Sequence, residues 1–435
     1  PTPNKAMLGT YLLRCPIQQD LTLDQSVRRV VPACAWRYSC KQPDTAPRLQ
    51  AYWTPPPVSP SRRYQSETLT QTFRALLEQA VTRATPAHPF AVCLSGGLDS
   101  GAVWGLVAHR AAQGDAHAAQ GVPCSLVFPG MDCDESPRIA AMRAFTRAAR
   151  HLETDAARVD PVAALAAAIE RTDGFVHGTG YFMALLAGST AADGRGTLLT
   201  GYGEEWVGGS FRYLADDLRV GRWWSVFRTL RQATPYRVKG TPRWPGLLND
   251  CGLGRLNRLR RWRKPAPTSP QPVRYSIQPQ AIPPLLTHLR PEPRASRDRR
   301  RLFQLLHQAQ STLLYEAVEQ LAAADGVELR HPFNDLDLVE FAFRTPPRAF
   351  TEGIRHKHLL RMALHDQLAP SVRDLLDKTL FNEVVAPYTR AVAANPVTAF
   401  ESLAFLGLLN WTESGKFWSG VSQYELPDAT GVRPS

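Results

Sequence analysis

The chain has 435 residues, of which 44% are hydrophobic and 21% charged, a composition typical of globular proteins with a sizeable core. Its length suggests two or three domains. Lysine and arginine outnumber aspartate and glutamate by 51 to 39, and the net charge of +12 favours an acidic or polyanionic partner without selecting one.

Sequence features also bear on the compartment. No apolar run is long enough to cross a bilayer, and we find no secretory signal at the start. The seven cysteines form no Cys-x-x-Cys pair and have no histidine at zinc spacing. We therefore expect free thiols in a cytoplasmic protein.

The first 64 residues combine short apolar pieces with polar segments. They contain the proline run Pro55–Pro57, which predicts a linker. Ser66 and Glu67 then begin a predicted helix. Its apolar face repeats at helical spacing through Leu69, Phe73, Leu76, Leu77, Ala80 and Val81.

The most informative stretch is the apolar run Phe90–Leu94, which predicts a buried strand, followed by the turn Ser95–Gly97. Glycines let backbone approach a ligand closely, and a helix that begins near Ser100 points free N–H groups at an anion. Asp99 would repel phosphate in such a cradle unless a divalent cation such as Mg²⁺ lies between them. Gly-Gly-x-Asp alone fits an ordinary strand-to-helix turn equally well, whereas the full Ser-Gly-Gly-x-Asp-Ser string is far more specific.

Two further apolar runs, Cys124–Phe128 and Thr197–Thr200, predict strands. Helices are expected over about 136–151 and 161–171. Strands that alternate with helices imply right-handed crossovers and a parallel sheet, so the predicted fold class is α/β with flanking helices.

Polar residues follow three of the predicted strands. Ser95, Asp134 and Glu204 each come shortly after a strand end. Ligands of parallel sheets bind beyond the carboxyl ends of the strands, so we expect these residues to converge on one crevice. Asp134 and Glu135 are better explained as caps of the following helix than as ligands.

The segment 219–301 is basic, contains Trp223 and Trp224, and becomes rich in proline in its second half. It fits either a solvated helix pair with a flexible loop or a docking surface for an acidic partner.

Helical periodicity returns after this segment. It predicts one long amphipathic helix over about 299–324 and shorter helices over 336–344 and 355–367. Lys357 is expected on an exposed face of the last helix, although it could reach a pyrophosphate.

Four separated stretches, taken together, resemble the synthetase domain of asparagine synthetases and their relatives, the β-lactam synthetases and lasso-peptide macrolactam cyclases. They are Ser95–Ser100, Gly201–Gly209, Val327–Asp335 and Asp377–Phe381. The resemblance covers about residues 64–395 and implies an adenine nucleotide alpha hydrolase-like domain that uses ATP and Mg²⁺. Such enzymes release AMP and pyrophosphate while they join a carboxylate to an amine. We expect this domain over 59–395, with 219–301 as an insert and 396–435 as a C-terminal tail.

Residues 1–58 resemble only the tail of the Ntn-type glutaminase domain of asparagine synthetases. That domain carries a nucleophilic cysteine at its start, whereas the first cysteine here is Cys15. The resemblance therefore implies a reduced N-terminal piece and an amine that belongs to the substrate itself.

Within the family, Phe128–Gly130, Glu205–Trp206 and Asp377–Thr379 look most like the lasso-peptide cyclases. This implies a precursor (core) peptide as the substrate, allows a leader peptidase as a partner protein, and gives no reason to expect a membrane or nucleic acid as a partner. Two other enzyme classes stay open: a small-molecule ligase like asparagine or β-lactam synthetase, and an RNA-modifying pyrophosphate-loop enzyme. A non-enzymatic nucleotide-binding scaffold is the least favoured alternative.

The resemblance also assigns the nucleotide and metal sites. Metal binding falls to Asp99 and Glu204, although Glu204 stands where the family has aspartate, in a turn one residue shorter. The alternative for Glu204 is a surface carboxylate near a helix start. Nucleotide binding falls to Ser95, Gly96, Gly97, Asp99, Ser100 and Gly203.

Two residues are candidates for the chemical steps. Glu328 is the candidate base that deprotonates the attacking amine. The alternative role of Glu328 is structural, as a salt-bridge partner of Arg330. Lys378 is the candidate residue for stabilising the oxyanion and the charge on the departing phosphate. The alternative is that Lys378 is a solvated lysine in a loop, with no catalytic role.

Overall fold

The computed structural model describes residues 66–172, 180–233 and 296–376 except 308, 353 and 354, and residues 20–57 except 23, 31, 43, 44, 46 and 47. It also describes residues 2, 4, 7, 237, 238, 241, 242, 247, 379, 381, 383 and 384. The C-terminal segment 396–435 and most of the basic segment 219–301 lie outside these residues.

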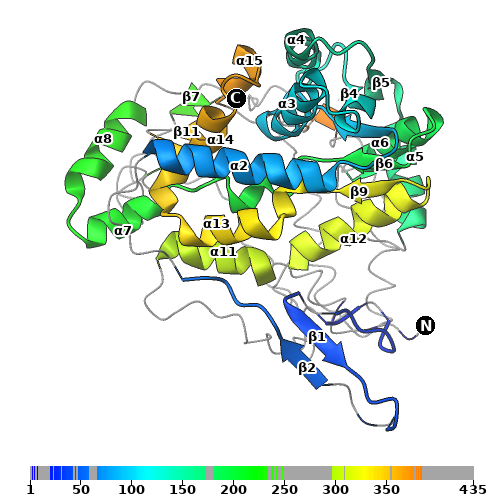
Figure 1. Cartoon of the computed structure of the whole chain (residues 1–435), viewed down its shortest axis with the longest axis horizontal. Coiled ribbons are helices and arrows are strands. Elements are labelled where there is room, and N and C mark those ends of the chain that lie inside the picture. Colours follow the sequence, from blue (N-terminus) through cyan, green and yellow to red (C-terminus); the bar gives the residue numbers. More distant parts are fainter. Residues whose placement is uncertain are drawn as a thin grey trace, which may run out of the picture.

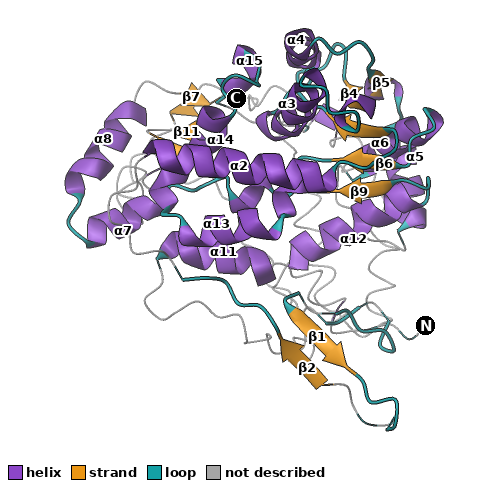
Figure 2. Ribbon diagram, in the orientation of Figure 1, coloured by secondary structure: helices purple, strands orange, loops and turns teal. Residues whose placement is uncertain are grey.

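A five-stranded sheet in the order β5-β4-β3-β6-β9 organises the structure (Figures 1 and 2). All four strand pairs are parallel, with Cys93 opposite Cys124 and Leu199 opposite both Val92 and Arg330. The strands are β3 (Phe90–Cys93), β4 (Gly121–Val127), β5 (Leu152–Asp155), β6 (Thr197–Leu199) and β9 (Glu328–Arg330). This arrangement confirms the predicted α/β class.

The strand order creates a switch point between β3 and β6. From β3 the chain builds β4 and β5 on one side, and it then returns to build β6 and β9 on the other. The loops that leave β3 and β6 consequently diverge, which opens a crevice beyond their carboxyl ends. The predicted site segments after Cys93 and Leu199 both begin there.

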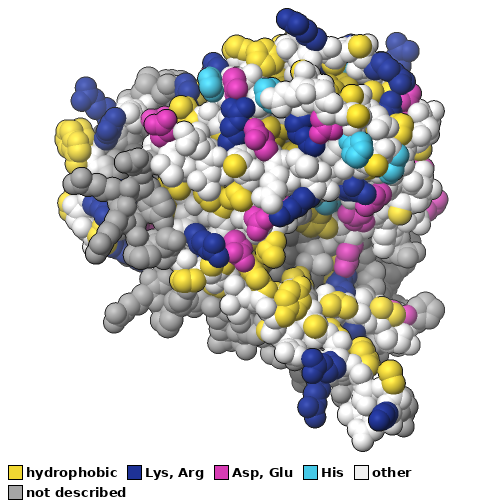
Figure 3. All heavy atoms as spheres, viewed as in Figure 1, with side chains coloured by type: hydrophobic (Ala, Val, Ile, Leu, Met, Phe, Trp, Pro, Cys, Tyr) yellow, Lys and Arg dark blue, Asp and Glu magenta, His cyan; other side chains and the backbone are white. Residues whose placement is uncertain are grey.

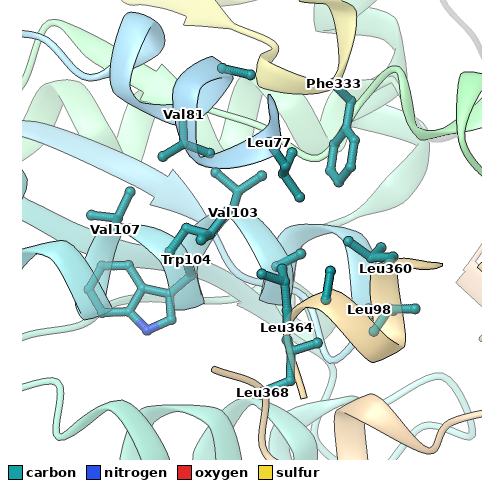
Figure 4. Close-up of a cluster of buried hydrophobic side chains, with 14 of the residues drawn as sticks. Leu77, Val81, Leu98, Val103, Trp104, Val107, Phe333, Leu360, Leu364 and Leu368 are labelled. Carbon is teal, nitrogen blue, oxygen red and sulfur yellow. The ribbon is translucent and has the colours of Figure 1, made fainter. Parts of the chain in front are cut away.

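Helices cover both faces of the sheet, since a parallel sheet is apolar on each side. Phe90 and Val92 pack into one cluster with residues of α2 and α3, whereas Ala91 packs into another with residues of α6 and α12. Figure 4 shows the first cluster, where Leu77 and Val81 of α2 lie near Val103 of α3. The helices that pack on the sheet or on one another around it are α2 (Ser66–Ala84), α3 (Leu98–Ala112), α4 (Ser136–Thr146), α5 (Pro161–Arg171), α6 (Tyr181–Ala192), α12 (Ala309–Ala323), α13 (Leu336–Arg344) and α14 (His358–Ala363).

Smaller elements surround this core (Figure 1). Helices α7 (Tyr213–Arg219) and α8 (Trp223–Ala233) pack on each other, α11 (Arg297–His307) packs on α7, and α15 (Pro370–Arg373) packs on α3 and α4. Three antiparallel pairs are β1–β2 (Cys34–Arg37, Arg48–Ala51), β7–β8 (Arg237–Val238, Thr241–Pro242) and β10–β11 (Thr351–Glu352, Arg355–His356). Short 3-10 turns cover Ala118–Gln120, Ala156–Arg158, Glu204–Trp206, Pro332–Asn334 and Pro347–Phe350.

Three predicted helices differ from the structure. The helix over 299–324 is two helices, α11 and α12, which pack on different neighbours, α7 and α6. The helix over 136–151 ends at Thr146, because Arg147 takes a left-handed conformation with φ +53°. The helix over 355–367 is strand β11 followed by the short α14. Periodicity alone did not reveal these breaks.

Other expectations can be checked directly. In the described part of the chain, no helix is both long and apolar enough to cross a membrane. Five described cysteines are free thiols, as predicted: Cys34, Cys40, Cys93, Cys124 and Cys133. On the face crossed by α2, basic and acidic side chains are interspersed rather than gathered by sign (Figure 3).

The central packing of α2 gives a stability prediction. Phe73 is fully buried, and the centroid of its ring lies 5.8 Å from that of Phe341 on α13. Phe73→Ala should cost about 3–5 kcal/mol in the free energy of unfolding because it leaves a cavity. Urea denaturation measures this loss, and the exposed neighbour Gln71→Ala should change stability by less than about 0.5 kcal/mol. Equal effects of the two substitutions would contradict the packing.

Candidate active site

The turn after β3 is held closed by its own side chains. Ser100 Oγ accepts the Ser95 N–H at 3.0 Å and lies 2.8 Å from Ser95 Oγ. Ser95 Oγ in turn accepts the Gly97 N–H at 3.3 Å. The start of α3 follows at Leu98. The predicted strand, turn and helix N-terminus are therefore all present, which is the geometry of an anion cradle.

Two carboxylates and one ammonium meet beside this turn. Lys357 Nζ lies 2.5 Å from Asp99 Oδ2 and 3.7 Å from Glu204 Oε1. The side chains of Asp99 and Glu204 are only 19% and 13% exposed, so water screens these charges weakly. The structure thus brings together the two residues predicted to bind metal.

Asp99 and Glu204 fit a magnesium ion bound together with phosphate. Asp99 Oδ1 is buried and has no hydrogen-bond partner within the described part of the chain, so one carboxylate oxygen stays available. The described residues contain no group of three or more His, Cys, Asp or Glu that could hold a metal alone. Mg²⁺ is commonly held by one or two carboxylates plus substrate phosphate oxygens, which is the donor set here.

Lys357 corrects the prediction of an exposed helix residue. It is 8% exposed and precedes α14 with φ +58°, a left-handed conformation that is uncommon outside glycine. Its backbone N–H donates to Gly208 O at 3.1 Å, which ties it to the loop after β6. The sequence pattern Arg-His-Lys-His suggested a surface position, and only the tertiary structure shows that the ammonium faces two acids.

A second polar cluster holds the turn through hydrogen bonds to Gly96. Gly96 donates its N–H to Glu135 Oε2 at 3.1 Å, and Arg138 Nε donates to Gly96 O at 3.0 Å. Thr379 Oγ1 donates to Glu135 Oε1 at 2.5 Å and accepts from Arg138 at 2.8 Å. The start of α4 therefore joins the turn to Thr379. Glu135 occupies the N-cap position of α4, as expected, but its carboxylate makes no capping bond and contacts the turn.

The loop after β6 depends on a glycine. Gly203 has φ +95°, and a Cβ at this position would lie 2.3 Å from Asn334 Oδ1. Any side chain here would displace the turn that presents Glu204. Gly203 therefore shapes the loop and does not line the cavity described below.

Tyr202 is a site residue that the sequence did not single out. Burial, and then the nearby Cys93 and Glu204, raise the pKa of the Tyr202 phenol far above its ordinary value. The phenol stays protonated at neutral pH and can act as a hydrogen-bond donor in the cavity.

These groups line a cavity of about 660 Å³ at the switch point. Its polar side includes Ser95, Asp99, Glu204 and Lys357. Its apolar side carries three mutually packed rings, Phe128, Phe182 and Phe381, together with Leu126, Met183 and Leu186. The volume lies within the range of small-ligand pockets.

Glu328, the predicted base, does not lie with these residues. It is the first residue of β9 and pairs with Thr197 at the beginning of β6, whereas the cavity lies beyond the ends of both strands. Its carboxylate is 56% exposed and accepts from Arg330 at 2.9 and 3.1 Å. The structure matches the alternative interpretation, a salt bridge with Arg330. Lys378, the other predicted catalytic residue, lies outside the described residues.

The arrangement defines a class of protein. A parallel α/β sheet that presents an anion-binding turn and two acids at its switch point is the architecture of a nucleotide-binding enzyme. The chain belongs to the asparagine synthase family: the family model described as Asparagine synthase matches residues 72–392. A search of curated proteins found no match. This family consists of ATP-dependent amide ligases, so the protein forms amide bonds with ATP.

The acidic turn at the cavity edge yields a pH prediction. Burial alone would raise the pKa of the Asp134 carboxyl, but hydrogen bonds from Ser136 and from the Phe128 N–H outweigh burial and hold the pKa below its ordinary value. A lowered pKa stabilises the folded protein above about pH 4, and this contribution disappears as pH falls through the folded-state pKa.

Asp134→Asn should therefore lower the free energy of unfolding by about 1 kcal/mol at pH 7, with a smaller difference from wild type at pH 3. Denaturant titrations at both pH values measure this. Asp132→Asn, on an exposed neighbour, is the matched control. A difference for Asp134→Asn that does not depend on pH would contradict a role for the charge.

Proposed function

We propose that this amide ligase is a lasso-peptide macrolactam synthetase. It adenylates an Asp or Glu side chain of a precursor peptide and lets the peptide's own N-terminal amine attack the activated carbonyl. The observation that carries the proposal is the meeting of Asp99, Glu204 and Lys357 beside the turn Ser95–Gly97 at the switch point. The resemblance of Phe128–Gly130 and Glu205–Trp206 to lasso-peptide cyclases supports the choice within the family.

A carboxylate is a poor acyl donor because oxide is a poor leaving group. In the proposed first step, a carboxylate oxygen attacks the α-phosphorus of ATP, the bond to the pyrophosphate oxygen breaks, and an acyl-adenylate forms. The turn and Lys357 would supply hydrogen-bond donors and positive charge to the phosphates. Asp99 and Glu204 would hold Mg²⁺, which supplies charge neutralisation on the polyphosphate.

In the proposed second step, the amine nitrogen attacks the acyl carbon and AMP leaves with the electron pair of the broken C–O bond. Lys378 remains our candidate for stabilising the charge that develops in this step. The rings of Phe128, Phe182 and Phe381 offer an apolar wall that would keep water away from the activated acid.

One observation favours a second candidate, a ligase that acts on a small molecule. A cavity of about 660 Å³ is of the size that holds a small ligand, and a peptide would have to extend beyond it. Both candidates use the same activation chemistry and differ in the acid and the amine.

Substrate choice can be tested with purified protein, ATP and Mg²⁺. We expect AMP release with synthetic peptides that carry a free amino terminus and one internal Asp or Glu, and little release with free aspartate. Mass spectrometry should show a peptide product that has lost one water. AMP release with aspartate alone would favour the small-molecule ligase, and ADP in place of AMP would overturn the activation chemistry.

Asp99→Asn should abolish AMP release, because it removes a carboxylate charge from the proposed metal site. The measurement is AMP formation over a range of Mg²⁺ concentrations, with thermal denaturation to show that the variant is folded. Asp366→Asn, which alters an exposed partner of Arg74, is the control and should keep wild-type activity. Near-native AMP formation by Asp99→Asn would remove this residue from the mechanism.

Lys378→Ala should lower product formation by about 100-fold or more while leaving the protein folded, because one preorganised cation is lost. Product formation under saturating ATP is the measurement. A near-native rate would show that Lys378 is a solvated loop residue.

A further inference from the structure

A hydrogen-bonded chain of three side chains connects the cavity wall with the protein surface. Thr200, the residue after β6, lines the cavity, and its Oγ lies 2.6 Å from Nδ1 of His331, the residue after β9. The other ring nitrogen, Nε2, lies 3.2 Å from Glu319 Oε1 on α12. Neighbouring parallel strands end at the same edge of the sheet, which is why Thr200 and His331 meet.

The partners determine where the protons lie. A carboxylate only accepts hydrogen bonds, so Nε2 of His331 carries the proton that faces Glu319. Nδ1 is then an acceptor, and the Thr200 hydroxyl donates to it. Thr200 Oγ also accepts the Tyr202 N–H at 3.2 Å, which fixes the hydroxyl in place.

The burial of the three side chains increases toward the cavity. Thr200 is 2% exposed and the His331 side chain 9% exposed, whereas the Glu319 side chain is 46% exposed. A proton that enters at Thr200 can therefore leave to solvent through Glu319.

Few other titratable groups face the imidazole. The rings of Tyr315 on α12 and Tyr202 after β6 lie 5.1 and 5.8 Å from it, and burial raises the pKa of Tyr315 to about 12, so that phenol is uncharged at neutral pH. Arg330, the last residue of β9, directly precedes His331, but its guanidinium pairs with Glu328. Among the described side chains, Glu319 is the one that forms an ion pair with His331.

We propose that Thr200, His331 and Glu319 form a proton relay that deprotonates the amine in the second step. The proposal rests on the proposed function. As the amine nitrogen bonds to the acyl carbon and AMP departs, an amine proton passes to Thr200 Oγ. The hydroxyl proton of Thr200 passes at the same time to Nδ1 of His331, and Glu319 stabilises the resulting imidazolium. The relay takes the place of Glu328, whose carboxylate lies at the opposite end of β9.

Separate assays of the two half-reactions test the relay. The probe is the synthetic acidic peptide that supports AMP release with wild-type protein. His331→Gln should leave peptide-dependent exchange of labelled pyrophosphate into ATP within about two-fold of wild type. Amide formation should fall by about 100-fold or more, the range of general base catalysis. Equal losses in both half-reactions would mean that His331 only holds the fold and would overturn the relay.

Hydroxylamine provides a chemical control, because it is a strong nucleophile that is unprotonated near neutral pH. His331→Gln should form the peptide hydroxamate as fast as wild type when hydroxylamine is added. Failure of hydroxylamine to restore acyl transfer would contradict a defect in amine deprotonation.

The pH profile distinguishes a relay from a structural role. Glu319→Gln removes the negative charge that stabilises the protonated ring, so the acidic limb of the amide-formation profile should move to lower pH. Glu316→Gln lies on the same helix but alters a pair with Arg29, and its profile should match wild type. An unshifted acidic limb in Glu319→Gln would overturn the relay. If wild-type protein itself releases no AMP with any peptide, the proposed function fails first and the relay fails with it.

Discussion

The organisation of the site depends on one ammonium group between two acids. Asp99 lies in the first turn of α3 and Glu204 begins a 3-10 turn after β6, and like charges in a poorly solvated crevice repel. Lys357 offsets this repulsion from a third element, the start of α14. The left-handed conformation of Lys357, its backbone bond to Gly208 and the helix that follows are all consistent with holding that charge in place. The crevice can therefore keep both carboxylates close together before any ligand arrives.

Three of the five strands, β3, β4 and β6, could be predicted because they carry local signatures, whereas β5 and β9 were not predicted. Phe90–Cys93 and Thr197–Leu199 are short apolar runs that are followed by glycine-containing turns, and these features depend only on neighbours in the chain. The turn Ser95–Ser100 was equally local, so its conformation could be anticipated. The break after Thr146 comes from the left-handed Arg147, and α14 packs on α2, which is far away in the chain, so periodicity records neither.

The site residues divide in the same way. Asp99 and Glu204 belong to the two motifs that follow β3 and β6, and the structure brings them together. Glu328 belongs to a motif too, but its position along β9 decides its role, and the sequence does not show which end of a three-residue strand faces the crevice. The burial of Lys357 and the contact of the Glu135 carboxylate were missed because their partners lie far away in the chain, so no local pattern indicates either contact.

The hydrogen bond between Gly96 and Glu135 has a consequence for ligand affinity. An amide N–H that already donates to a carboxylate is not free for a phosphate oxygen, so an incoming anion must either displace Glu135 or forgo that donor. Thr379 and Arg138 bind the same carboxylate, so displacement would also break the hydrogen bond that Thr379 donates. Anion binding at the turn and the hydrogen bonding of Thr379 are thereby linked through a single side chain.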